Sequence, residues 1–150
     1  MPLRGQEKVL ANFDRERQRL ITSVEKNARE MAEFLLKKIR ENASLTDHTL
    51  DDLRQLGHPY AKRNPRPPHT PWWLIHRQSG TLVDALEMDN PAPGHYRVGF
   101  DENRAPHVPY VLLGTRTMIG RDILNETVRA EAENLRKIFA KDIRAFRRVS

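Results

Sequence analysis

The chain of 150 residues suits one domain with a modest core, because only 38% of its residues are apolar and 31% are charged. Its 26 Lys and Arg outnumber its 20 Asp and Glu, and a formal charge of +6 fits contact with an acidic protein or with nucleic acid. The absence of cysteine excludes disulfides and thiolate sites, and the lack of a long apolar run or signal peptide predicts a soluble protein made in the cytoplasm.

A single long helix is predicted over residues 6–42, which contain neither Gly nor Pro. Apolar side chains recur every three or four residues in its second part and form one stripe: Leu20, Val24, Ala28, Met31, Leu35 and Ile39. Val9, Leu10 and Phe13 begin a weaker stripe that Arg17 interrupts. A helix of this length exceeds the diameter of a small domain. Its first part is therefore expected either to project or pack on another subunit, or to be a solvated helix start.

Residues 49–121 are predicted to hold short helices, a sheet and loops. Thr49 and Asp52 fit a capping box that opens a short helix ending before Gly57. Four prolines between Pro65 and Pro71 exclude helix and interior strand, which predicts a stiff extended segment able to lie across another surface.

Two strands and several connecting pieces follow the proline-rich segment. Residues 72–78 read as a strand, and residues 81–88 carry apolar side chains at helical spacing. Residues 90–94 contain two prolines and a glycine and are predicted to form a turn. Residues 95–100 alternate as a second strand, whereas residues 108–113 fit either a strand or a short helix that Gly114 ends.

The last predicted helix covers residues 122–147, with Asp122 as its cap. Its core stripe is expected to contain Leu124, Val128, Leu135, Phe139 and Phe146. Three arginines close the chain where cations suit a helix end: Arg144, Arg147 and Arg148. Together the elements predict an α+β domain in which two long helices pack on a small, largely antiparallel β-sheet.

Neither a catalytic nor a metal-binding constellation emerges from the sequence. None of the six histidines forms a His-x-x-x-His pair or a recognised ligand motif with a carboxylate. Serine has no Gly-x-Ser-x-Gly setting, and no glycine-rich loop suits a phosphate. We therefore expect a protein without enzymatic activity, metal or cofactor.

One stretch combines cations with aromatic rings: Lys62, Arg63, Arg66, Trp72, Trp73 and Arg77. Stacking rings beside cations can grip single-stranded nucleic acid. The alternative is that the two tryptophans anchor the proline-rich segment to the core. The mixed charges along both long helices favour a protein partner over a nucleic acid.

The segment from Tyr110 to Arg121, YVLLGTRTMIGR, resembles the signature of the tail-completion (neck) proteins of long-tailed bacteriophages. In that family a Tyr-led apolar segment runs into Gly-Thr, followed by a Met-containing loop and an Arg before the final helix. Residues 78–82 (QSGTL) and 57–61 (GHPYA) are similar to two further family segments. The chain departs from the pattern at Leu112, where an acidic residue is frequent, and at Asp122, where Pro is frequent.

The resemblance spans roughly residues 10–147 and implies a structural virion protein of the neck, which joins head and tail or completes the tail. It implies a homo-oligomeric ring, expected to be hexameric, through whose channel DNA passes without sequence-specific binding. Other neck, connector or tail proteins are the implied partners, and the implied location is the virion after synthesis in the host cytoplasm. No membrane is implied.

Two groups of residues are expected at protein interfaces. The first belongs to the family-like segment and comprises Tyr110, Gly114, Thr115 and Arg121. The second comprises the proline-rich residues Pro65, Arg66, Pro67 and Pro68 and the terminal cluster Arg144, Arg147 and Arg148. The alternative functions are a small basic nucleic-acid-binding protein and a toxin-type ribonuclease, the latter requiring a convergent acid–base set.

Overall fold

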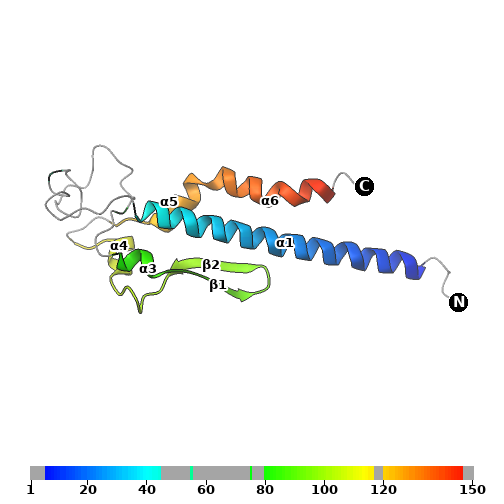
Figure 1. The fold of residues 1–150 in the computed structure, drawn as a ribbon, viewed down its shortest axis with the longest axis horizontal. Helices are drawn as coiled ribbons and strands as arrows, with labels where there is room; N and C mark the ends of the chain where they lie inside the picture. Colours follow the sequence, from blue (N-terminus) through cyan, green and yellow to red (C-terminus); the bar gives the residue numbers. More distant parts are fainter. Residues whose placement is uncertain (1–5, 45–54, 56–74, 76–79, 117–119, 147–150) are drawn as a thin grey trace.

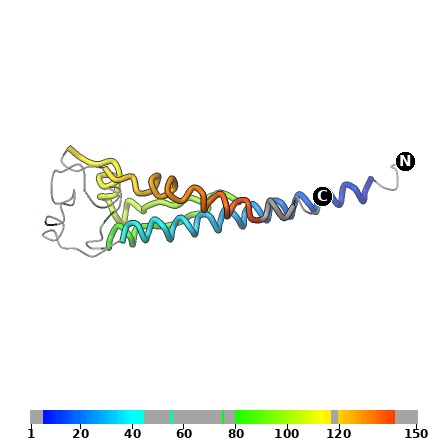
Figure 2. Tube along the Cα trace, turned by 90° about the horizontal axis from the view of Figure 1, so that it is seen from above, coloured from blue at the N-terminus to red at the C-terminus, as the bar shows by residue number. Residues whose placement is uncertain are grey.

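The computed structural model describes residues 6–44, 55, 75, 80–116 and 120–146, whose helices and strands are labelled in Figure 1. Helix α1 spans Gln6–Asn42, as the sequence predicts, and its 37 residues measure about 55 Å. Ion pairs one turn apart run along its surface, such as Glu16–Arg19 at 2.7 Å and Arg29–Glu33 at 2.8 Å. Pairs three or four residues apart lie on the same face of a helix and support its formation, although solvent screens exposed pairs such as these. Helix α1 is the longest element, and the hairpin and α6 lie along it (Figures 1 and 2).

A short helix and an antiparallel hairpin lie along one side of α1 (Figure 1). Helix α3 is Thr81–Asp84, strand β1 is Leu86–Ala92 and strand β2 is His95–Phe100. Paired positions include Leu86 with Phe100 and Met88 with Val98. The helical spacing read over residues 81–88 is therefore wrong beyond Asp84, because strand pairing with β2 satisfies the backbone of residues 86–88.

The hairpin turn is tighter than the sequence predicts. Strand β1 continues through Pro91 to Ala92, so the turn consists of Pro93 and Gly94 rather than residues 90–94. The register shifts between Asp89 and Ala92, and this irregularity accommodates Pro91, which has no amide hydrogen for the ladder. Strand β2 has the predicted bounds.

Helices α4, α5 and α6 complete the described chain. Residues Val108–Leu113 form helix α4, so the short helix is the correct one of the two alternatives, strand or helix, that the sequence left open. The single helix predicted over residues 122–147 is instead two helices, α5 at Ile123–Ala130 and α6 at Ala132–Phe146. At the break, the Glu131 amide still donates to Thr127 O, and Glu131 O accepts from the Leu135 amide. The chain therefore changes direction without losing those backbone bonds, and α6 then runs beside α1 (Figure 1).

The core lies where the C-terminal end of α1 meets α3, α4 and α5. Its buried residues are Ala43, Ile75, Leu82, Ala85, Ala105, Val108 and Ile123. The Ile75 amide donates to Asn42 O at 3.1 Å, which ties this part of the chain to the end of α1. The described residues thus form an α+β fold with one two-stranded antiparallel sheet. The short helix predicted from Thr49 and the rest of the strand predicted over residues 72–78 lie outside the described residues, apart from Gln55, which is helical.

Candidate assembly surface

The N-terminal part of α1 extends past both the hairpin and α6 (Figures 1 and 2). Every side chain from residue 6 to residue 22 is exposed, as expected both for a part of the helix that packs on another subunit and for a solvated helix start. Five of the exposed side chains are large and apolar and form what we call the projecting stripe: Val9, Leu10, Phe13, Leu20 and Ile21. Phe13 is 70% exposed and Leu10 is 63% exposed. Large apolar side chains gathered on one helix face are typical of a surface that another molecule covers.

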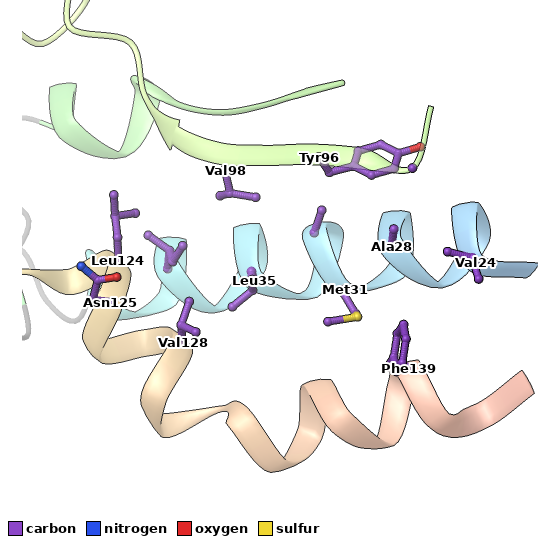
Figure 3. Close-up of a pocket in the computed structure, with 13 residues that line it drawn as sticks. Val24, Ala28, Met31, Leu35, Tyr96, Val98, Leu124, Asn125, Val128 and Phe139 are labelled. Carbon is purple, nitrogen blue, oxygen red and sulfur yellow. The ribbon is translucent and has the colours of Figure 1, made fainter. Parts of the chain in front are cut away.

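An apolar groove begins where the projecting part of α1 ends. Its volume is about 610 Å³, and its floor is the apolar face of α1: Val24, Ala28, Met31, Ala32, Leu35 and Ile39. Gly94, Tyr96 and Val98 of the hairpin form one wall, whereas Leu124, Asn125, Val128 and Phe139 of α5 and α6 form the other. Figure 3 labels ten of the lining side chains, which come from α1, β2, α5 and α6. The lining residues include no charged side chain, so the groove suits an apolar occupant.

Two side-chain hydrogen bonds hold the α5–α6 wall against the floor of the groove. Asn27 Nδ2 donates to the carbonyl oxygen of Phe139 at 3.3 Å, and Asn42 Nδ2 donates to Thr127 Oγ1 at 2.9 Å. Both Asn27 and Thr127 are fully buried. A buried polar group is costly unless it is bonded, so these contacts fix how α5 and α6 lie on α1. These two bonds could not be predicted from the sequence, because nothing in an apolar stripe indicates which polar neighbour becomes buried.

The hairpin wall carries an ion pair on its outer surface. Arg97 donates to Asp89 through Nε at 3.1 Å and Nη2 at 2.7 Å, and the two residues are directly opposite in the strand register. The hydrogen bonds and charge of Arg97 lower the pKa of the Asp89 carboxyl below its ordinary value. On α1, the hydrogen bond from Lys38 likewise lowers the pKa of Glu41. Both pairs are exposed and stabilise local structure, and neither forms part of an acid–base set.

The described residues of the segment from Tyr110 to Arg121 bring the end of α4 close to the start of α5. Gly114 has φ 83° and ψ 178°, a conformation essentially restricted to glycine, which confirms the predicted end of α4. A Cβ on Gly120 would lie 2.5 Å from the Leu113 carbonyl carbon and 2.6 Å from its oxygen. The Arg121 amide donates to Val111 O at 2.8 Å. The loop therefore returns against α4, and Gly120 is needed because backbone atoms fill the space beside it.

Part of the first predicted interface group gathers at this loop. Tyr110 is 61% exposed and Thr115 is exposed, whereas Gly114 is half-buried between them. Arg121 is fully buried within the chain. Asp122, where the family pattern favours Pro, caps α5 by accepting a hydrogen bond from the Asn125 amide at 3.1 Å.

The other predicted interface residues are not described. The proline-rich group Pro65, Arg66, Pro67 and Pro68 lies outside the described residues, as do Arg147 and Arg148. Arg144 belongs to α6, but its side chain is not described. The interface roles of both groups stay predictions.

Within the described residues, no helix combines the length and the apolarity needed to span a membrane, and no cluster of His, Asp or Glu suits a metal ion. The geometry places an apolar stripe and an apolar groove end to end on one helix. Neither a family model nor a curated protein nor a solved structure matches the chain.

Proposed function

We propose that this chain is a structural assembly protein of the bacteriophage neck, which joins head and tail or completes the tail by forming a ring. The observation that carries the assembly role is the projecting stripe on α1, whose large apolar side chains are all between 40% and 70% exposed. Covering a single large apolar side chain contributes about 1.5–3 kcal/mol, so several together supply a substantial driving force for association.

The assignment to a phage neck rests on the resemblance in residues 110–121 and on the order of elements. The described chain has a long first helix, a hairpin, a Gly-Thr loop and terminal helices in that order. Tyr110 of α4 and Thr115, which follows Gly114, are both exposed and therefore accessible to a partner. The proposal includes no enzymatic activity and no cofactor.

A ring follows if each copy offers one surface to a neighbour and receives a different surface from the next. Such head-to-tail contacts close into rings when the rotation between copies permits. We propose a homo-oligomeric ring, with six copies as the expected number, in the neck or tail of the virion. Its other partners are neck, connector or tail proteins, and DNA passes through its channel.

The second candidate is a nucleic-acid-binding protein, and one observation favours it. Arg15, Arg19 and Lys26 line a shallow hollow on one face of α1. A row of cations can follow a phosphate backbone. Two of these cations already have carboxylate neighbours, however, because Arg19 pairs with Glu16 at 2.7 Å and Lys26 lies 3.9 Å from Glu30.

Electron microscopy of the purified protein tests the proposal. Closed rings with an axial channel, together with weak DNA binding and no cleavage of RNA, are the expected result. Salt-sensitive DNA binding by a monomer would favour the second candidate, since each contact between a cation and a phosphate releases counterions and steepens the salt dependence of binding. Cleavage of RNA by the purified protein would favour the ribonuclease alternative instead.

A further inference from the structure

We propose that the projecting stripe of one copy lies in the apolar groove of a second copy. This inference rests on the proposed function, because it names the contact through which copies would join. Both surfaces belong to α1, where the stripe is the exposed N-terminal continuation of the face that forms the groove floor. Val24 marks the junction, since it lines the groove and is also 39% exposed.

The groove has the architecture of a helix receptor. Its floor is a helix, and its two walls are the hairpin on one side and α5 with α6 on the other. An amphipathic helix binds such a groove through apolar anchors spaced three or four residues apart. Leu10 and Phe13 are three residues apart, and Val9 and Phe13 are four apart, so the stripe presents this spacing.

A helix cannot fold back on itself, so the stripe cannot enter the groove of its own chain. Leu10 and Val24 are 14 residues apart in one continuous helix, which separates them by about 21 Å along the axis. The occupant must therefore come from another molecule. A second copy is the occupant that the charges favour.

Charge complementarity supports the second copy. Arg17 is the one charged residue that interrupts the stripe, and it is exposed with no ion pair among the described residues. Glu25 is half-buried at the mouth of the groove, where its Cγ would lie 3.8 Å from a Cβ on Gly94. Glu25 also has no ion pair within the described part of the chain. A stripe docked in a neighbouring groove brings Arg17 toward that carboxylate, which is the opposite charge its insertion requires.

The proposed contact is head-to-tail, because the stripe and the groove are different surfaces. An open assembly then retains one unfilled groove at one end and one free stripe at the other until the ring closes. This is the type of contact that a ring requires. It also explains why a helix that is too long for its own domain bears apolar residues at its far end.

Disulfide trapping tests the contact, and the chain has no native cysteine to interfere. A Leu10→Cys variant is mixed under oxidising conditions with a variant carrying Val128→Cys or, at another point of the same wall, Phe139→Cys. A cross-link between unlike variants is expected, since bridged Cα atoms must approach within about 7 Å. The matched control is Arg15→Cys, which lies on the opposite face of α1 and should cross-link with neither wall variant. Failure of both wall pairs, or preferential cross-linking of Leu10→Cys to itself, overturns the proposal.

A charge exchange provides the second measurement. Arg17→Glu and Glu25→Arg should each raise the dissociation constant of the assembly by roughly tenfold, and the double variant should restore it, because the pair is re-formed in reverse. Circular dichroism confirms that each variant is folded. Additive losses in the double variant would contradict the pairing.

The outcomes separate this inference from the proposed function. Rings without the Leu10 cross-link would leave the proposed function intact and overturn the docking contact. The cross-link in a particle that is not a closed ring would establish the contact and overturn the ring. A folded monomer that cross-links with neither wall variant would overturn both.

Discussion

Two glycines determine the shape of the loop that the sequence singled out. Gly114 occupies a backbone conformation that side chains disfavour, and Gly120 lies against backbone atoms of Leu112 and Leu113. The first requirement could be anticipated, because a glycine ending an apolar segment commonly adopts positive φ. The second could not, because it depends on how closely the chain returns to α4.

Replacing Gly114 by Ala should lower the free energy of unfolding by about 1–3 kcal/mol, the usual range for a side chain held in such a conformation. Gly99→Ala is the matched control, since Gly99 lacks positive φ and a Cβ there meets nothing within 4 Å. Chemical denaturation of the two variants measures the difference. Equal losses of stability would contradict the account of Gly114.

The hydrogen bond between Asn42 and Thr127 should appear as energetic coupling between α1 and α5. Asn42→Ala and Thr127→Val each remove one partner and leave the other polar group unsatisfied, at about 1–3 kcal/mol. The double variant removes both groups and should cost less than the two single losses added together. Denaturation of the four proteins gives the coupling directly, and strict additivity would show that the bond contributes nothing.

At the scale of elements, the sequence predicted those whose periodicity is long and uninterrupted. Helix α1 and strand β2 have the expected bounds, because neither contains a proline and each has a regular apolar pattern. The break at Glu131 has no counterpart in the sequence, since residues on both sides favour helix and the backbone bonds continue through it. Its cause is tertiary: Thr127 and Leu135 are both buried, and α6 must follow the direction of α1.

The exposed stripe and the groove floor illustrate the same limit. The apolar periodicity predicted that the stripe and the groove floor lie on one face of α1. Periodicity alone could not predict which half of that face the rest of the chain covers. The hairpin and α6 end before the N-terminal part of α1 (Figure 1), so the same pattern is a floor in one half and a free surface in the other. The sequence predicted an apolar face on strand β2 and an apolar stripe on the last helix, but not that these two surfaces form the walls of a groove.

The hairpin should weaken in acid through Asp89. Arg97 lowers the pKa of Asp89 in the folded chain, so the stabilisation is present above the unfolded value of about 3.9 and is lost as pH falls through the folded value. An NMR titration of the Asp89 carboxyl should give a pKa below that of the Arg97→Gln variant. The control is Glu41 on α1, whose pKa is lowered by Lys38 and which Arg97→Gln should leave unchanged. Identical Asp89 titrations in the two proteins would exclude a role for Arg97.

At the scale of the whole molecule, the part of α1 that packs in the core is distinct from the part that we propose for assembly. The core lies at the C-terminal end of α1, whereas the residues from 6 to 22 are all exposed. Removing the first part of the helix therefore takes away little of the core. The cations of this exposed part, Lys8, Arg15, Arg17 and Arg19, contribute to the formal charge of +6.

The mass of the protein in solution tests the central claim most directly, that the projecting part of α1 joins copies of the chain. Sedimentation velocity compares the full chain with a variant that lacks residues 1–18, at equal concentration and with the unfolding transition of each recorded. We predict an assembly of several 17.5 kDa chains for the full protein and a folded monomer for the shortened one. A full chain that sediments as a monomer, or a shortened chain that assembles as before, would contradict the account.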